Sequence, residues 1–249
     1  MDPSEEALPA PVPIVLVHGG GHGAWCWEPL LALLDRPVVA VDLPPVSIRG
    51  GPGRHETPPE LDTVCLADWA DAVLAAADDA GFDRFVLVGH SLAGLTLGAV
   101  AHRAPERVAH LVFVSALAPA QGENGISAMA PEMMERVAGG LTEAVVTEMF
   151  CNDMDTAQTR FVLDHFGGDS VQVMLEPVDR SGIPAALSKT YVRLRRDNAL
   201  TPAAQDASIA ALEAVPGGRV AIVDLDTGHN VMISHPADLA AVLNGLEEL

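Results

Sequence analysis

One segment indicates chemistry most clearly, FVLVGHSLAG at residues 85–94. An apolar run ends in a short turn that holds Ser91, and an alanine- and leucine-rich stretch follows. This is the context of a nucleophile elbow, a tight strand-to-helix turn that leaves a serine hydroxyl exposed. The small residues that such a turn needs are Gly89 before the serine and Ala93 after it, with Gly94 next. The pattern predicts that Ser91 is a nucleophile near the positive end of a helix.

A serine hydroxyl needs a base within hydrogen-bond reach, because it is a weak nucleophile near neutral pH. His229 suits this role, since it follows the last apolar run (220–224) on a short loop, DTGH at residues 226–229. Chain order supports the choice, because a base that follows the serine and the acid is typical of this kind of elbow. His235 is the competitor. It directly precedes Pro236, and we expect it to contribute to the start of a helix there.

The acid that orients the base is expected on a loop after the penultimate strand, and Asp197 lies there. The alternative for Asp197 is a turn or capping aspartate paired with the arginines that precede it. Asp224 and Asp226 are rivals for the same role. Their closeness to His229 in sequence leaves little room to reach the far side of its ring. The sequence therefore favours Asp197.

Acyl transfer also needs N–H donors for the oxyanion that develops in the transition state. The backbone amide after the nucleophile, that of Leu92, is one candidate. The second is Gly20, in the early loop HGGGHGAW at residues 18–25. The glycines allow the backbone to turn its amides toward the site. Phosphate binding is the alternative for such a loop, but neither the lysine of a P-loop nor the G-x-G-x-x-G spacing is present.

Other polar and aromatic residues near these motifs have simpler interpretations. His18, His22 and His90 lack a neighbouring carboxylate at a metal-ligand spacing, so we predict no metal and expect each ring to brace loop backbone. Trp25 and Trp27 are expected to pack. For Ser115 we expect a hydroxyl satisfied at the end of a strand, and the alternative is that it faces the cleft.

These residues must be positioned by alternating strands and helices, and the sequence predicts an α/β fold with a mostly parallel sheet of about six strands. Short β-branched runs give the expected strands at 13–17, 37–42, 84–89, 111–115, 190–194 and 220–224. Alanine- and leucine-rich stretches give the expected helices at 28–34, 62–80, 92–103, 202–214 and 236–246. Without a repeat or a low-complexity linker, residues 1–249 are expected to form a single domain.

The segment 118–187 interrupts this alternation, because it shows no clear strand yet is too long for a bare loop. Its weak helical periodicity predicts a helical cap inserted before the penultimate strand, with the core formed by 10–117 and 188–249. We expect its methionines and phenylalanines both to hold the cap together and, in part, to line an apolar pocket. The expected lining residues are Gly19, His22, Met129, Met133, Met149 and Phe150.

Composition sets further limits on function. The net charge of −20 argues against nucleic acid as a partner. Cys26, Cys65 and Cys151 are widely spaced and odd in number, which favours reduced thiols in the cytoplasm. The acidic start at residues 1–6 is unlike a secretory signal, and no apolar run reaches the roughly 18 residues of a membrane span. We expect a soluble protein with no membrane partner and no cofactor. The oligomeric state is not readable, and a homodimer is one arrangement that we allow for.

With these motifs together, the sequence resembles the α/β-hydrolase superfamily along nearly its whole length. The likeness is greatest to the branch of plant methylesterases, hydroxynitrile lyases and bacterial EstC-like or pyrethroid-hydrolase-like esterases. It rests on the segments 18–25 and 89–94, on Asp197 and on Gly228-His229. The resemblance implies Ser91 as nucleophile, Asp197 as acid and His229 as base. It implies oxyanion donors at the amides of Gly20 and Leu92.

Two departures from the lyase members bear on the chemistry. Similar hydroxynitrile lyases carry a lysine just after the histidine and a threonine just after the first loop histidine, where this chain has Asn230 and Gly19. The resemblance therefore favours hydrolysis of a small, fairly apolar carboxylic ester. One alternative is a lyase, cyclase or dehydratase that uses the same residues for acid–base chemistry on a metabolite. Another is a non-catalytic ligand-binding protein.

Overall fold

The computed structural model describes residues 11–44, 63–168, 171–215 and 218–246. The acidic start at 1–6 and the first residue of the helix expected at 62–80 lie outside the described residues. Six parallel strands form one sheet in the order β2-β1-β3-β4-β5-β6. They are β1 (Ile14–Val17), β2 (Val38–Val41), β3 (Phe85–His90), β4 (Val108–Val114), β5 (Ser188–Leu194) and β6 (Ala221–Leu225).

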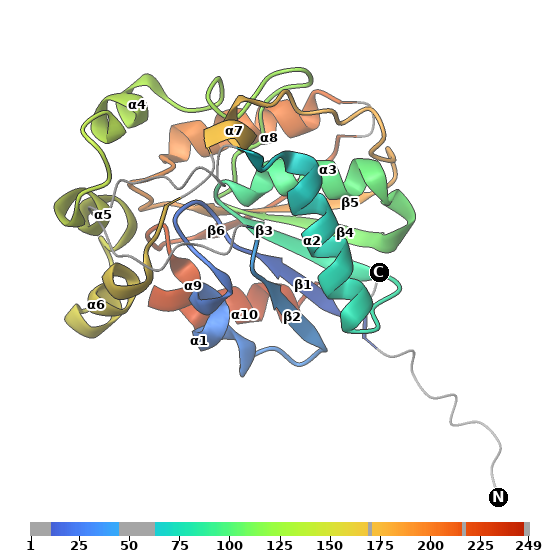
Figure 1. The fold of residues 1–249 in the computed structure, drawn as a ribbon. Coiled ribbons are helices and arrows are strands. Elements are labelled where there is room, and N and C mark those ends of the chain that lie inside the picture. Colours follow the sequence, from blue (N-terminus) through green and yellow to red (C-terminus); the bar gives the residue numbers. More distant parts are fainter. Residues whose placement is uncertain (1–10, 45–62, 169–170, 216–217, 247–249) are drawn as a thin grey trace, which may run out of the picture.

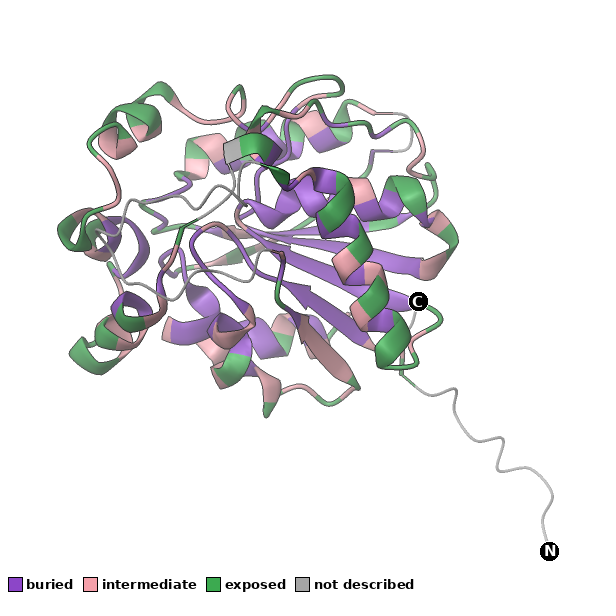
Figure 2. Cartoon of the chain, in the orientation of Figure 1, coloured by how far each residue is buried: buried purple, intermediate pink, exposed green. Residues whose placement is uncertain are grey.

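Helices cover both faces of this sheet (Figure 1). On one face lie α2 (Leu66–Asp79), α3 (Ala93–Arg103) and α8 (Pro202–Glu213). On the other lie η1 (Ala24–Trp27), α1 (Glu28–Leu31), α9 (Val231–Ser234) and α10 (Pro236–Asn244). A short η3 (Pro105–Arg107) links α3 to β4. Alternate residues of each central strand enter the two cores, so β1, β3 and β4 are buried throughout (Figure 2).

The predicted strands are all present, but two begin earlier than their apolar runs suggest. β4 begins at Val108 and β5 at Ser188, because the polar residues His110 and Lys189 are buried inside them. His110 Nε2 lies 2.8 Å from the hydroxyl of Thr190, and Lys189 Nζ donates to the carbonyl of Leu187. A hydrogen-bonded polar side chain is tolerated in a strand interior. The α/β fold is confirmed, including helices between β4 and β5 that are consistent with the cap.

The described part of the cap segment contains four helices. They are α4 (Pro131–Val137), α5 (Glu143–Phe150), α6 (Thr156–His165) and α7 (Val171–Leu175). The side chains of Thr142 and Asp155 accept hydrogen bonds at the starts of α5 and α6, which explains where these helices begin. In Figure 1, α4, α5 and α6 extend to one side of the sheet as a separate group. No helix among the described residues is both long and apolar enough to cross a membrane.

Strand order brings the predicted site residues to one edge. β1 pairs with β2 on one side and with β3 on the other, which makes its carboxyl end a switch point where ligands of α/β sheets commonly bind. The strands end in register there, with Val17 beside Gly89, His90 beside Val114, and Leu194 beside Leu225. The loop at 18–25, Ser91, and the loops bearing Asp197 and His229 all leave the sheet at this edge.

Candidate active site

Ser91 sits in the strained turn that the sequence predicts. Its φ of 56° lies in the left-handed region, which is unusual for a residue other than glycine. The turn is fixed from β4, because the Ser91 amide donates to Val114 O and the amide of Leu117 donates to Ser91 O. Strain at a single residue persists only where surrounding contacts impose it, and such residues cluster at functional sites.

The small residues of the elbow are required by close packing. A Cβ on Gly89 would lie 2.1 Å from a methyl of Leu97 and 3.2 Å from the Cβ of Ala93. At Gly94 a Cβ would lie 2.0 Å from the carbonyl oxygen of Leu117. Strand β3 can therefore turn directly into α3 while the loop after β4 crosses the helix start.

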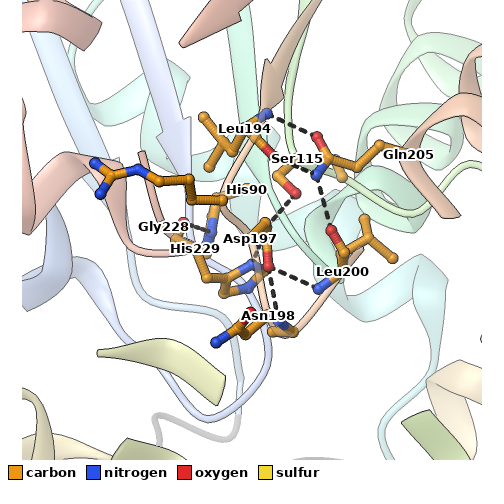
Figure 3. Close-up of polar contacts among 12 residues, drawn as sticks. His90, Ser115, Leu194, Asp197, Asn198, Leu200, Gln205, Gly228 and His229 are labelled. Atoms are coloured by element: carbon orange, nitrogen blue, oxygen red, sulfur yellow. Dashed lines mark hydrogen bonds and ion pairs between the residues drawn. The ribbon is translucent and has the colours of Figure 1, made fainter. Parts of the chain in front are cut away.

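Asp197 and His229 form a buried pair three and four residues beyond the ends of β5 and β6 (Figure 3). His229 Nδ1 lies 2.6 Å from Asp197 Oδ2, and the side chains are 1% and 0% exposed. The other oxygen of Asp197 accepts the amides of Ala199 and Leu200 at 2.7 and 2.8 Å. With Nδ1 donating to the carboxylate, Nε2 of a neutral imidazole is an acceptor. His229 Nε2 is buried and has no hydrogen-bond partner among the described residues.

The nucleophile elbow contacts the loop that carries the base (residues 226–229, the base loop). The contact is made through His90, which precedes the serine. The rings of His90 and His229 have centroids 4.4 Å apart. His90 Nε2 lies 3.0 Å from the carbonyl oxygen of His229, to which it donates. Burial lowers the pKa of His90 well below its ordinary value, with the neighbouring His229 as the next cause. A neutral His90 thus ties the nucleophile turn to the base without competing for its proton.

The fourth donor to Asp197 is Ser115, which directly follows β4. Its hydroxyl lies 2.6 Å from Asp197 Oδ2, the same oxygen that receives His229 (Figure 3). The residue is fully buried, has a φ of 39° and donates its amide to Val192 O. The expected satisfied hydroxyl is confirmed. The sequence did not indicate that its partner is Asp197. A serine directly after the strand next to the elbow was the available signal.

The arginines before Asp197 do not pair with it, and the rival carboxylates face elsewhere. Arg193 and Arg195 pair with Asp224, whereas Arg196 lies 3.4 Å from Asp226, whose side chain is 84% exposed. His235 occupies the first capping position of α10 without a side-chain capping bond. None of these rivals lies within hydrogen-bond reach of the His229 ring among the described contacts.

The early glycine loop is braced by its two histidines, as expected. His18 Nε2 accepts the amide of Leu43, so its Nδ1 donates to Gly19 O at 2.9 Å. His22 Nδ1 donates to Gly20 O at 2.7 Å, and burial lowers the pKa of His22 to about 3. Among the described residues no partner takes the amide of Gly20 or Leu92. Both predicted oxyanion donors lie at the site edge, and their role stays a prediction.

Gly19 lies directly against the nucleophile. A Cβ at this position would be 2.6 Å from the Cβ of Ser91 and 2.9 Å from His90 O. Asn230, at the other position that distinguishes this chain from the lyases, is fully buried next to the base. No charged side chain stands at either place. Among the described residues, no group of three or more His, Cys, Asp or Glu side chains could hold a metal ion.

Aromatic rings form one wall between the glycine loop and the cap. The His22 ring stacks on Trp25 at 5.3 Å and meets Phe150 and Phe166 edge-on. Phe150 also contacts the ring of His229 at 5.2 Å. Phe161 and His165 of α6 also pack on Trp25, with ring centroids 5.4 and 5.1 Å from it. This wall is mostly apolar and lies next to the base, and His22 Nε2 and Trp25 Nε1 are buried polar atoms in it without a hydrogen-bond partner among the described residues.

The predicted pocket residues are distributed unevenly. His22, Gly19 and Phe150 lie at the site, whereas Met149 is fully buried in the core shared by the cap and α9. Met133 packs against that core and Met129 against the one on the other face. Trp27 is buried in the core, as expected, and Trp25 belongs to the aromatic wall. Which methionines meet a substrate stays a prediction.

Comparisons with known proteins agree with the fold. A family model described as "Alpha/beta hydrolase family" matches residues 14–242. A rice protein named probable esterase PIR7A is 40% identical over 132 residues, which are 49% of this chain and 45% of that protein. The match thus spans under half the length of that relative. A carbendazim hydrolyzing esterase from Nocardioides sp. is 26% identical over 250 residues, 93% of this chain and 98% of the esterase.

Solved structures show the same fold. A pyrethroid hydrolase from Sphingobium faniae JZ-2 superposes with a TM-score of 0.72 at 21% identity, covering 93% of this chain and 95% of that chain. Further relatives are named as methylesterases and as a norfluorocurarine synthase. The relatives are therefore mostly esterases, with some synthases among them.

Proposed function

The chain belongs to the alpha/beta hydrolase family, and from this premise we propose that it hydrolyses carboxylic esters with Ser91 as the nucleophile. Within the family it groups with the methylesterase-like and pyrethroid-hydrolase-like esterases. The observation that carries the proposal is the buried Asp197–His229 pair, whose unpartnered Nε2 lies at the sheet edge where the strained Ser91 leaves β3.

In the acylation step, His229 Nε2 takes the proton of the Ser91 hydroxyl while its oxygen attacks the ester carbonyl carbon. The buried carboxylate of Asp197 stabilises the imidazolium that forms and keeps Nδ1 protonated. The amides of Gly20 and Leu92 hold the oxyanion. His229 then returns the proton to the departing alcohol, and the acyl group remains on Ser91.

In deacylation, His229 takes a proton from water, whose oxygen attacks the acyl carbonyl. His229 then returns this proton to the Ser91 oxygen as its bond to the acyl carbon breaks and the acid leaves. Gly19 supports this step, because a side chain there would occupy the space beside the Ser91 Cβ. The absence of a cation at Asn230 supports hydrolysis over release of a cyanide anion.

We propose a small and fairly apolar ester as the substrate. The aromatic wall of His22, Trp25, Phe150 and Phe166 supports this class, since ligand sites are mostly apolar with a few placed polar groups. A cytoplasmic location also remains our proposal, and it rests on the free thiols of Cys26, Cys65 and Cys151.

A fluorophosphonate probe tests the proposal and separates it from acid–base use of the same residues. A nucleophilic serine gains the covalent mass of the probe, whereas a serine that only relays protons does not. We expect one probe per chain, mapped to Ser91 by peptide mass, and none on Ser91→Ala. Turnover of p-nitrophenyl esters by a protein that the probe leaves unlabelled would contradict the nucleophilic role.

A further inference from the structure

Two consecutive cap residues bind the backbone directly before the acid and directly before the base. They are Asn152 and Asp153, in the turn between α5 and α6. Asn152 Nδ2 donates to the carbonyl oxygen of Arg196 at 2.8 Å, and Arg196 precedes Asp197. Asp153 Oδ2 accepts the amide of Gly228 at 2.5 Å, and Gly228 precedes His229. One turn of the cap therefore holds both loops of the acid–base pair.

The environment of Asp153 shows that this contact is built in and not incidental. Its side chain is only 2% exposed, so the carboxylate is held by few and specific partners. The same oxygen accepts the hydroxyl of Ser234 at 3.2 Å, and His235 Nδ1 lies 3.4 Å away. The other oxygen, Oδ1, is buried without a hydrogen-bond partner among the described residues, so Oδ2 carries all of these contacts. A buried carboxylate is costly unless it is hydrogen-bonded, which makes the contacts of Oδ2 important. These groups anchor the turn to the loop that carries the base and to α9 behind it.

Gly228 is required for this approach. A Cβ there would lie 2.5 Å from Asn152 Oδ1 and 2.6 Å from Asp153 Oδ1, closer than real Cβ contacts. The missing side chain lets the backbone before His229 reach the cap turn. The glycine before the base thus matches a specific pair of cap side chains.

The loop that carries Asp197 (residues 195–200, the acid loop) makes further hydrogen bonds to the cap. The Asn198 side chain donates to Glu148 O at 3.2 Å, and Arg136 donates to Asn198 O at 2.6 Å. The two loops also join each other, because the Arg196 amide donates to Thr227 O at 3.0 Å. Acid loop, base loop and cap turn are therefore joined in a closed ring of hydrogen bonds through the residues just before the pair.

We propose that Asn152 and Asp153 are positioning residues that fix the Asp197–His229 hydrogen bond from the cap. The cap is then a structural part of the catalytic machinery as well as a roof over the substrate. Because misplacing a catalytic group by about 1 Å can cost about 100-fold in rate, holding both loops from one rigid turn matters for catalysis. This inference rests on the proposed function for its kinetic readout only.

The test compares Asp153→Ala with Asp155→Ala. Asp155 lies two residues away and caps α6, where its side chain accepts the amide of Gln158, but it binds neither catalytic loop. Both variants remove a carboxylate from the segment between α5 and α6, and both are expected to weaken the cap. Only Asp153→Ala frees Gly228. Asp153→Asn keeps an acceptor for the Gly228 amide without the charge.

Two readouts are measured on the full chain. The first is kcat and KM with p-nitrophenyl acetate. The second is the downfield proton resonance of the His229 Nδ1–H bond to Asp197, assigned by its loss in His229→Gln. The resonance reports the geometry of the pair whether or not the protein hydrolyses esters, so failure of the proposed function and failure of this inference are distinguishable.

For Asp153→Ala we expect kcat to fall at least about tenfold with KM nearly unchanged, and the resonance to broaden or vanish. Asp155→Ala should keep the resonance and kcat within about twofold, and Asp153→Asn should recover most of the loss. If Asp153→Ala does not fold, Asn152→Ala tests the same ring from the acid side, with the same expected losses. Equal losses of kcat in Asp153→Ala and Asp155→Ala would overturn the proposal. An intact resonance in Asp153→Ala, or in Asn152→Ala where that variant replaces it, would overturn it as well.

Discussion

The hydroxyl of Ser115 and the imidazole of His229 donate to the same oxygen of Asp197, each at 2.6 Å. The second oxygen is held by the amides of Ala199 and Leu200. The carboxylate thus has four donors, namely the Ser115 hydroxyl, the His229 ring and two backbone amides of its own loop. Its orientation toward His229 is determined by the fold before any substrate binds.

Replacing Ser115 with alanine should lower kcat/KM about tenfold, because a hydrogen bond to a buried charged group is worth roughly 1.5–3 kcal/mol. Three donors then remain on the carboxylate, so it orients the ring of His229 less firmly. Steady-state kinetics with a p-nitrophenyl ester measure the loss. Ser115→Gly is the matched control, since glycine accepts the positive φ of 39° without strain. Wild-type rates in Ser115→Gly would show that the hydroxyl is dispensable.

Gly19→Ala should reduce esterase activity by at least about tenfold in a folded protein. The new methyl group would lie 2.6 Å from the Ser91 Cβ, so the elbow must shift by several tenths of an ångström. Gly98→Ala is the control, because a Cβ in that position of α3 meets nothing within 4 Å. It should leave activity unchanged and raise stability by up to about 1 kcal/mol, measured by urea unfolding. Full activity in Gly19→Ala would contradict the tight geometry.

Asp197→Asn should preserve the fold but lower kcat by about 10⁴, the magnitude known for the same change in a serine protease triad. The asparagine oxygen can still accept the amides of Ala199 and Leu200. Its NH₂ group then faces His229 Nδ1 and imposes the wrong tautomer. Single-turnover kinetics and a melting curve measure the two effects separately. A loss below tenfold would assign the acid role to another residue.

Stability should decrease on acidification through histidines that are buried in the neutral form. Burial lowers the pKa of His110 to about 4 and that of His22 to about 3, against 6.5 for the unfolded chain. The unfolded chain binds these protons at a higher pH than the folded chain does. The stabilisation by the neutral histidines is therefore fully present above pH 6.5, and it is lost as the pH falls below that value. Each such histidine contributes a slope of about 1.4 kcal/mol per pH unit down to its folded pKa.

The variant His110→Gln isolates one of these contributions far from the active site. The glutamine can still bind the hydroxyl of Thr190 but does not titrate. Urea unfolding between pH 7 and 4.5 should show a shallower slope than in the wild type, with the pH dependence of hydrolysis unchanged. An identical slope would show that His110 takes up a proton in the folded state.

Local sequence patterns were enough to predict the main residues of the site. The elbow at Ser91, the glycine loop and the late Asp197 and His229 follow from residue types beside apolar runs, and the sheet brings such loop positions together. The early starts of β4 and β5 were missed because His110 and Lys189 interrupt the apolar runs. Burial of His110 depends on Thr190 of the neighbouring strand, and Lys189 is satisfied by the carbonyl of Leu187 only once the chain is folded, so no local pattern shows either.

The contacts of the cap with the catalytic loops could not be predicted from the sequence, for a related reason. Asn152 and Asp153 read as ordinary turn residues between two weakly amphipathic helices. Their partners, Arg196 and Gly228, are 44 and 75 positions away along the chain. The described part of the cap has no strand that would fix its register on the sheet, so only the folded chain shows which turn meets which loop. The same lack of register left the roles of Met129 and Met133 open.

Rapid-mixing kinetics with a p-nitrophenyl ester test the central claim most directly. If Ser91 is acylated, the wild-type protein should release a burst of p-nitrophenol in proportion to the enzyme before the steady state. The variant Ser91→Ala should show no burst and almost no turnover, while the Asp197–His229 pair stays folded. A Ser91→Ala protein that retains the burst and the full rate would contradict the account.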